Sequence, residues 1–354
     1  MEGETISREF TGSNPGVSVL LPVYNSASYL RESIESILNQ SFKKYELLII
    51  CEPCTDNSSE IINSYKDSRI IHIQNEKRLG LANSLNKGIE LARGEYIARM
   101  DADDVSLPER LARQVDFLET HPEIGVLGTG FHIMDGYGNT SHAVQFPMQD
   151  SVLRWCLCFY NPIVHPSVMM RRKIVEQAGG YSSDMTHAED YDLWRRLSCV
   201  TRLSNMQDVL LHLRKHDANG SILNPPEEQR FSAQISSLMI SHILNEEVSA
   251  GTVQRLWGQG FQTASDVRPG AELVYRLYQT IIVNDELSII EKRAIRRGAA
   301  IQLCRLSRPW VKNASVWGVL ARACYLDPFL VLRVAEWRLR RLFNMRSRPS
   351  RWSF

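Results

Sequence analysis

Three carboxylates within four residues form the strongest chemical signal in the chain. Residues 100–104 read Met-Asp-Ala-Asp-Asp and directly follow an apolar segment typical of a buried strand. Like charges this close repel one another, so they need a counter-charge. A divalent cation with hard oxygen ligands supplies one, and two-residue spacing on an extended backbone places Asp101 and Asp103 on the same side. The alternative is a solvated loop whose Asp104 caps the helix near Pro108. The location after a strand favours a metal site.

Alternating strands and helices must position these carboxylates. Apolar runs predict buried strands at 17–23, 46–51, 69–74, 96–100 and 124–129. Amphipathic segments between them predict helices around 30–38, 58–65, 81–92 and 108–121, with Gly94 ending the third. This alternation predicts an α/β fold, a mostly parallel sheet with helices on both faces. Ligands of such sheets bind beyond the carboxyl ends of the strands, here after Val23, Cys51, Gln74 and Met100.

The rest of the chain is less regular and then becomes helical. Helices are expected near 173–178 and 189–198, followed by short strands to about residue 213. The run Asn224-Pro225-Pro226 marks a domain boundary. We therefore predict a disordered or loosely ordered N-terminus over 1–16, an α/β domain over 17–223 and a helical, basic C-terminal region over 224–354.

Charge is distributed unevenly along the chain. Residues 290–354 hold 15 Lys and Arg against 3 Asp and Glu, whereas the formal net charge of the whole chain is +1. The body of the protein is therefore acidic and its tail basic. Such an asymmetry indicates an anionic surface as the partner of the tail.

Cysteine usage and the N-terminus bear on the compartment. The N-terminus is polar, without the apolar core of a signal peptide, and no apolar stretch reaches the length of a bilayer span. The seven cysteines are an odd number scattered along the chain, which argues against a disulfide framework. Cys51 and Cys54 form one CxxC without a second pair or a nearby histidine, which favours an incidental pair over zinc or redox chemistry. These features predict a reducing cytoplasm.

Several motifs, in order along the chain, resemble the family-2 inverting glycosyltransferases of GT-A fold. They are PVYN at 22–25, TDNS at 55–58, LGLANSLNKGIELARGEYIARMDADD at 79–104, PERLARQVDFLETHPEIGVLGT at 108–129 and AEDYDLWRRL at 188–197. The resemblance covers about residues 17–222 and is strongest to bacterial enzymes that build exopolysaccharide, capsule or O-antigen units. It implies a Rossmann-like GT-A domain with a nucleotide-sugar half at about 17–130 and an acceptor half at about 131–223.

The resemblance places the donor site at the ends of the first strands. Asp101 and Asp103 would be the DxD pair that holds Mg²⁺ or Mn²⁺ on the donor diphosphate, where the metal neutralises charge on the leaving nucleotide. The nucleotide-sugar contacts implied are at Pro22, Tyr24, Asn25, Asp101 and Ala102. For the PVYN residues, the alternative is a simple strand-ending turn, which proline and asparagine favour.

Three further positions are assigned to the donor site. Where the family carries Asp-Asp-Gly-Ser, this chain reads Cys-Glu-Pro-Cys at 51–54, so Glu52 keeps the carboxylate that contacts the base in similar enzymes, and the first acid is lost. Arg78 follows the third strand and could pair with phosphate, with a solvated surface arginine as the alternative. His216 is the candidate that reaches the metal or the diphosphate, the alternative being a histidine hydrogen-bonded beside a loop.

Acids at the start of a later helix are assigned to catalysis. Inverting transfer needs one base that takes the acceptor hydroxyl proton, and by resemblance this base is Asp190, supported by Glu189. Alternatively, both acids only favour the helix N-terminus through its macrodipole. Asp192 and Trp194 are expected to orient the helix and line the acceptor site. His165 belongs to a stretch near the acceptor pocket, with structural packing as the alternative.

The sequence thus predicts a metal-dependent inverting hexosyltransferase. Its donor would be a nucleotide-diphosphate sugar, with UDP favoured, and its acceptor a glycan or polyprenyl-diphosphate-linked glycan of bacterial surface polysaccharide. Alternatives are a polyprenyl-phosphate sugar transferase and an inactive GT-A scaffold protein. No nucleic-acid partner is expected.

The basic C-terminus suggests where such an enzyme works. Residues 329–343 interleave apolar residues with arginines, a pattern suited to an anionic membrane interface, with packing on the catalytic domain as the alternative. The predicted location is the cytoplasm, peripheral on the inner face of the cytoplasmic membrane if the tail binds lipid.

Overall fold

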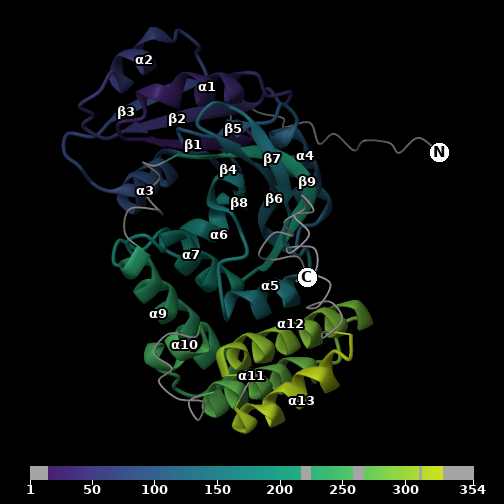
Figure 1. Ribbon diagram of the computed structural model, residues 1–354. Coiled ribbons are helices and arrows are strands. Elements are labelled where there is room, and N and C mark those ends of the chain that lie inside the picture. Colours follow the sequence, from purple (N-terminus) through teal and green to yellow (C-terminus); the bar gives the residue numbers. More distant parts are fainter. Residues whose placement is uncertain (1–14, 217–224, 258–266, 311–312, 330–354) are drawn as a thin grey trace. The chain divides into compact units, whose positions relative to one another are not determined.

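The computed structural model describes residues 15–216, 225–257, 267–310 and 313–329 (Figure 1). The chain divides into two compact units, one of Met1–Met148 and Pro162–Glu228, the other of Gln149–Asn161 and Gln229–Phe354. The sequence placed a single boundary at residue 224. In the structure, the segment Gln149–Asn161 groups with the C-terminal helices instead. Almost all of the predicted N-terminal segment 1–16 lies outside the described residues.

Within the described residues, the first unit is built on a nine-stranded mixed sheet of order β3-β2-β1-β4-β8-β6-β9-β5, with β7 paired to β6. The strands are β1 Val17–Val23, β2 Tyr45–Cys51, β3 Ile70–Gln74, β4 Tyr96–Arg99, β5 Val105–Ser106, β6 Ile124–Asp135, β7 Thr140–Val144, β8 Met169–Arg171 and β9 Arg202–Lys215. Strands β1 to β4 pair in parallel, as predicted. Strand β8 runs antiparallel to β4 and β6, and β5 antiparallel to β9, so the α/β class is confirmed with a more mixed sheet than expected.

Helices cover both faces of the parallel part of this sheet. They are α1 Ala27–Leu38, α2 Ser58–Ser64, α3 Leu81–Leu91 and α4 Arg110–Thr120 (Figure 1). Helix α1 buries apolar side chains about one turn apart, such as Leu30 and Ile34. Helix α3 approaches the sheet so closely that a Cβ on Gly88 would lie 3.0 Å from the Ile50 side chain. Because both faces are covered, all seven residues of β2 are buried.

Gly94, expected to end the third helix, has another structural role. Helix α3 already ends at Leu91, and Gly94 lies beyond it. A Cβ on Gly94 would lie 2.5 Å from the backbone nitrogen of Ser18, and its own N–H donates to Ser18 Oγ at 2.8 Å. The prediction was therefore wrong about this residue, which is a glycine because the chain passes close to β1.

The second half of the sheet brings the end of β9 to the acidic loop. Two long strands, β6 and β9, pair in parallel from Ile124 to Asp135 where only short strands were expected. The short strand β5, which follows the acidic loop directly, pairs Val105 with His212 of β9. Residues at the end of β9 therefore lie beside the carboxylates that follow β4. Between the two long strands, this unit also contains η1 His165–Ser167, α6 Arg172–Gln177 and α7 Glu189–Ser198.

The second unit is helical, as expected for the C-terminal region. It contains α5 Asp150–Leu157, α10 Ala250–Leu256, α11 Val267–Ile282, α12 Ile289–Ser307, α13 Trp317–Leu326 and nearly all of α9 Pro225–Leu244. Helix α12 begins with a capping box formed by Ser288 and Glu291. Helix α5 packs on it, with Trp155 against Gly298 and Ser151 donating to Glu291 at 2.6 Å.

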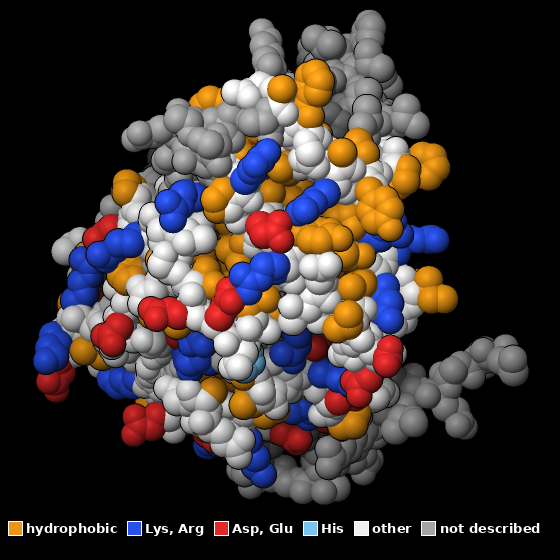
Figure 2. Space-filling view, turned by 90° about the horizontal axis from the view of Figure 1, so that it is seen from below, with side chains coloured by type: hydrophobic (Ala, Val, Ile, Leu, Met, Phe, Trp, Pro, Cys, Tyr) orange, Lys and Arg blue, Asp and Glu red, His pale blue; other side chains and the backbone are white. Residues whose placement is uncertain are grey.

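The surface of the second unit carries apolar side chains among basic ones. Trp317, Tyr325 and Phe329 are each more than half exposed. Figure 2 shows hydrophobic side chains interspersed with Lys and Arg on the face seen from below. None of the described helices combines the length and the apolarity needed to cross a bilayer. The basic segment 330–354, to which the membrane prediction mainly refers, lies outside the described residues.

Candidate active site

The three carboxylates after β4 converge on one point. Asp101, Asp103 and Asp104 each offer an oxygen within 4.8 Å of the others. Asp104 is buried, with Oδ1 accepting the Arg214 backbone N–H at 2.7 Å and Oδ2 lacking any hydrogen-bond partner. Burial and the neighbouring charge of Asp101 raise the pKa of Asp103, and burial with both neighbours raises that of Asp104 well above its ordinary value. An orphaned carboxylate oxygen beside two others fits a divalent cation.

Part of the counter-charge comes from the protein itself. Arg99, the last residue of β4, is fully buried and forms an ion pair with Asp101. The charges of Asp101 and Asp104 help to raise the pKa of Arg99 despite its burial. The expectation that a metal alone balances the carboxylates was therefore incomplete. Two more buried guanidinium groups lie near the loop, Arg214 and Arg110, and the charge of Asp104 acts on Arg110. The feature that favours a cation is therefore the Asp104 oxygen without a hydrogen-bond partner, beside the two other carboxylates.

The end of β9 holds the acidic loop in place. Arg214 is buried and donates from Nε to the Asp103 carbonyl at 2.7 Å and from Nη1 to the Asp135 carbonyl at 3.3 Å. Its Nη2 contacts the Glu32 carboxylate at 2.5 Å. Two residues later, His216 Nε2 lies 2.9 Å from Asp103 Oδ2. The structure thus brings the predicted metal residues Asp101, Asp103 and His216 together.

The predicted nucleotide residues line the ends of β1 and β3. Asn25 adopts φ 46°, a left-handed conformation that asparagine tolerates, and its Oδ1 accepts the Thr55 N–H at 2.8 Å. Tyr24 is exposed, and the Arg78 guanidinium lies 4.2 Å from the centre of its ring. Pro22 lies in β1, half-buried. Tyr24 and Arg78 therefore form one accessible surface at this edge, although their nucleotide contacts remain predictions.

Glu52 uses its carboxylate within the protein. It is buried, and it accepts the Leu79 N–H at 2.8 Å and the Ser84 hydroxyl at 2.5 Å. These bonds fix the loop that carries Arg78. Ala102 is likewise buried, inside the acidic loop. Neither residue presents an open polar group to a ligand, so both assignments stay predictions.

The predicted catalytic acids begin α7 and meet the acidic loop around Tyr181. Burial raises the pKa of Tyr181, and the charges of Arg99, Asp190 and Glu189 act on the same hydroxyl. Burial also raises the pKa of Glu189, with a smaller lowering effect from the charge of Arg99 and a raising effect from that of Asp101. Asp190 is half-buried, and its Oδ1 accepts the Tyr191 N–H at 2.7 Å. The two carboxylate clusters are therefore neighbours.

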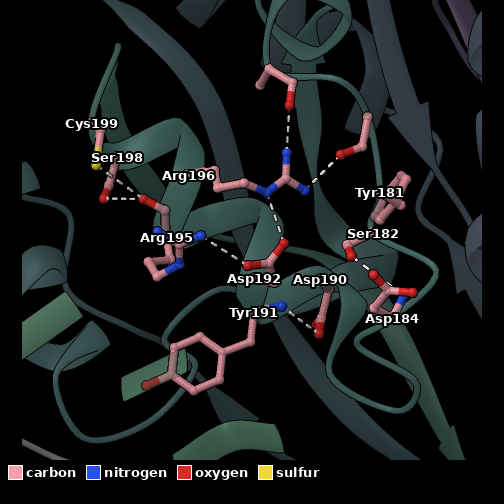
Figure 3. A network of polar contacts seen from close by, with 12 residues as sticks. Tyr181, Ser182, Asp184, Asp190, Tyr191, Asp192, Arg195, Arg196, Ser198 and Cys199 are labelled. Carbon is pink, nitrogen blue, oxygen red and sulfur yellow. Dashed lines mark hydrogen bonds and ion pairs between the residues drawn. The ribbon is translucent and has the colours of Figure 1, made fainter. Parts of the chain in front are cut away.

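The residues assigned to the acceptor site are buried. Figure 3 shows Asp192 between Arg195 and Arg196. Its carboxylate oxygens lie 3.0 Å from Arg195 Nη2 and 2.7 Å from Arg196 Nε. Trp194 is fully buried, and the His165 ring lies edge-on to it. Burial lowers the pKa of His165 well below its ordinary value, so the ring is neutral, and its Nε2 lies 2.8 Å from the Tyr181 hydroxyl. Asp192 orients Arg196 of the same helix, and Arg196 donates to the carbonyls of Ala178 and Gly180. Contact of Asp192 or Trp194 with an acceptor remains a prediction.

Four residues near the site were not singled out from the sequence. Arg99 and Tyr181 lie between the carboxylate clusters, and their burial could not be read from composition. His187 has φ 68°, a strained conformation just before α7. Glu228 in α9 has a raised pKa through burial and the charge of Asp190, yet it follows the expected domain boundary. Of these four residues, only Arg99 could have been found from the sequence, because it lies two residues before Asp101 at the end of the same strand.

Comparisons with known proteins identify the family of the chain. The family model "Glycosyl transferase family 2" matches residues 18–179. An uncharacterized glycosyltransferase of Methanocaldococcus jannaschii, MJ1057, is 38% identical over 209 residues, covering 56% of this chain and 71% of that protein. The putative glycosyltransferase EpsE of Bacillus subtilis is 37% identical over 209 residues, covering 57% and 74%. The O-antigen biosynthesis glycosyltransferase WbnJ of Escherichia coli is 30% identical over 206 residues, covering 57% and 80%.

Solved structures show the same fold at low sequence identity. S. aureus TarS in complex with UDP-GlcNAc superimposes with a TM-score of 0.56 at 16% identity, covering 90% of this chain and 92% of that one. The mannosyltransferase PcManGT of Pyrobaculum calidifontis, in complex with GDP-Man and Mn²⁺, gives 0.51 at 16% identity, covering 89% and 88%. The predicted GT-A fold with a helical C-terminal region is thus confirmed. Together with the family model and the sequence relatives, it shows that the chain is a glycosyltransferase and belongs to glycosyltransferase family 2.

Proposed function

We propose that this glycosyltransferase moves one sugar from a nucleotide-diphosphate donor to a glycan or lipid-linked acceptor, with inversion at the anomeric carbon. The observation that carries the proposal is the meeting of two carboxylate clusters around Arg99 and Tyr181. One cluster, with an orphaned oxygen on Asp104, suits a cation and a diphosphate. The other, at the start of α7, supplies a base.

Asp101 and Asp103 would hold Mg²⁺ or Mn²⁺, with the orphaned Asp104 oxygen beside them and His216 within reach of Asp103. When bound, the ion supplies Lewis-acid stabilisation of the departing nucleotide diphosphate. The protein's own part is to hold these ligands in position through Arg214. The structure of PcManGT with GDP-Man and Mn²⁺ supports a divalent ion as the cofactor class, by analogy of fold.

The donor would lie across the ends of β1 to β4. Tyr24 and Arg78 form the accessible edge, where stacking on a base and pairing with phosphate are both chemically possible. Similar folds bind UDP-GlcNAc in TarS and GDP-Man in PcManGT, which supports a nucleotide sugar as donor. We favour UDP as the nucleotide.

Asp190 is proposed to take the proton from the acceptor hydroxyl while this oxygen attacks the anomeric carbon. Glu189, with its raised pKa, is proposed to support it and to keep this end of the site from accumulating a second full charge. Tyr181 and neutral His165 form a fixed polar wall beside the two acids. A single base on one face of the sugar is the requirement for inversion.

The acceptor class rests on relatives and on charge. WbnJ is described as an enzyme of O-antigen biosynthesis, which supports a role in bacterial surface polysaccharide synthesis. The excess of Arg after residue 290 supports peripheral attachment to an anionic membrane at its cytoplasmic face.

Removing residues 330–354 is expected to abolish sedimentation with anionic vesicles while activity on a soluble acceptor persists. Unchanged sedimentation of the truncated protein would contradict membrane attachment through this segment.

The donor assignment is tested by nucleotide-sugar hydrolysis in the absence of acceptor. A panel of UDP-, GDP- and dTDP-sugars is incubated with the purified protein, with MnCl₂ and with EDTA. We expect release of one nucleoside diphosphate that depends on the metal and is lost in Asp103→Asn. Absence of turnover with every donor, alongside metal and nucleotide binding, would instead support an inactive scaffold.

A further inference from the structure

Two cysteine thiols lie at the turn that leads from β2 to α2, at the edge of the sheet where the nucleotide is proposed to bind. Cys51 ends β2 and Cys54 follows in the turn before α2, and both are free. Their sulfur atoms lie 3.7 Å apart. The sequence favoured an incidental pair, but this distance leaves only a small movement between two thiols and a disulfide.

The two cysteines differ in mobility and access. Cys51 is fully buried and is held by pairing with Val23 of β1 and Gln74 of β3. Cys54 is partly exposed and lies outside any strand or helix. Burial raises the pKa of the Cys51 thiol to about 12. Cys54 is therefore the thiol that a reagent in solution meets first, and Cys51 is the slower partner.

The turn is tied directly to the predicted nucleotide site. The Asn25 N–H donates to Cys54 Sγ at 3.4 Å, and Asn25 Oδ1 accepts the N–H of the next residue, Thr55. Glu52 lies between the two cysteines and fixes the loop of Arg78 through the Leu79 N–H. A displacement of Cys54 therefore changes the position of Asn25 first.

We infer that Cys51 and Cys54 form a redox-sensitive pair whose oxidation to an intramolecular disulfide weakens nucleotide binding. The inference rests on the donor site proposed above. With oxidised glutathione as oxidant, the Cys54 thiolate attacks one sulfur of glutathione disulfide and releases one glutathione thiol. Cys51 then loses its proton and attacks Cys54 Sγ, releasing the second glutathione thiol. Two protein thiols are oxidised and one disulfide is reduced, so the electrons balance.

Disulfide formation requires only a small movement of Cys54, but this movement breaks its contact with Asn25. A disulfide bond is about 2.05 Å long, so the sulfur atoms must approach by about 1.7 Å. Because β1 and β3 hold Cys51, Cys54 makes most of this movement. The Asn25 N–H then loses its sulfur acceptor, and the 54–55 connection to β1 shifts. A loss of one such positioned contact typically weakens binding by about fivefold to tenfold.

The test compares reduced and oxidised full-length protein. The protein is treated with dithiothreitol or with oxidised glutathione, and tryptic peptides are analysed by mass spectrometry. The peptide Tyr45–Lys66 contains both cysteines and no others, so an internal disulfide appears as the loss of two hydrogens from it. Binding of UDP and of GDP, each with MnCl₂, is measured by calorimetry on the same samples. We expect the disulfide, and a Kd about fivefold to tenfold higher for the preferred nucleotide, reversed by dithiothreitol.

Variants separate this pair from other thiols. Cys54→Ser should lose the response, and Cys51→Ser should instead accumulate a glutathionyl group on Cys54. Cys199→Ser, which removes an exposed thiol on another part of the first unit, should respond like the wild type. Absence of the internal disulfide, or a disulfide with unchanged Kd, in a protein that binds nucleotide when reduced would overturn this inference alone. A reduced protein that binds neither nucleotide would overturn the donor site and, with it, the inference.

Discussion

Arg214→Met removes the side chain that joins the end of β9 to the acidic loop. The carbonyls of Asp103 and Asp135 each lose a hydrogen bond that contributes about 1 kcal/mol. The pair with Glu32, whose side chain is 55% exposed, contributes only about 0.5 kcal/mol. The Arg214 guanidinium also lies 4.5 Å from the centre of the partly exposed Tyr29 ring, a cation–π contact of about 1 kcal/mol. Together these contacts amount to about 3.5 kcal/mol, and the free energy of unfolding is expected to fall by this amount.

Urea denaturation of the variant and the wild type measures this difference. Arg113→Met is the matched control, because Arg113 makes a single exposed ion pair with Asp208 at 2.9 Å and should cost less than about 1 kcal/mol. Arg214→Lys keeps the charge but lacks the planar guanidinium, so its loss in the free energy of unfolding should lie between those of Arg214→Met and Arg113→Met. The Mn²⁺ concentration for half-maximal activity should rise for Arg214→Met and not for Arg113→Met. If Arg214→Met is as stable as Arg113→Met and its metal dependence is unchanged, Arg214 does not hold the acidic loop in place.

Three further substitutions test the carboxylates. Asp103→Asn is expected to lower kcat by about 10²–10³-fold and to weaken Mn²⁺ binding, as measured by titration, while the circular dichroism spectrum stays that of the wild type. Asp190→Asn should lower kcat strongly with little change in donor Kd, since its contact forms with the acceptor in the transition state; an equal loss of donor affinity would argue against the base. Asp104 has a folded pKa raised above its unfolded value, so its ionised form destabilises the metal-free protein at neutral pH. Asp104→Asn should therefore gain stability over the wild type at neutral pH, and the gain should shrink as pH falls towards the ordinary range of aspartate; a gain independent of pH would contradict the raised pKa.

The parallel half of the fold could be predicted because its signals are local. Buried strands such as β2 are apolar throughout, and helices such as α1 carry an apolar stripe, so each element is visible in a short window. The order of the elements then placed Asp101 and Asp103 at the carboxyl edge of the sheet. The fold class and the family were confirmed on this basis.

Other features depend on contacts between distant segments. Arg99 reads as one charged residue in a strand, and only the fold shows that it is buried as the partner of Asp101. Gly94 reads as a helix stop, whereas its close neighbour is Ser18, far away in the sequence. The segment Gln149–Asn161 lacks any boundary signal, yet its helix α5 packs on α12, more than a hundred residues later in the chain. Such pairings leave no periodic trace in a single sequence.

The anomeric configuration of the product tests the central claim most directly. The enzyme is supplied with the nucleotide sugar identified from the donor panel and an acceptor, and the new glycosidic linkage is followed by proton NMR. The proposed site, with one base at Asp190 opposite the leaving diphosphate, predicts a linkage of configuration opposite to that of the donor, formed only with a divalent cation. A product that retains the donor configuration would contradict the single-base mechanism.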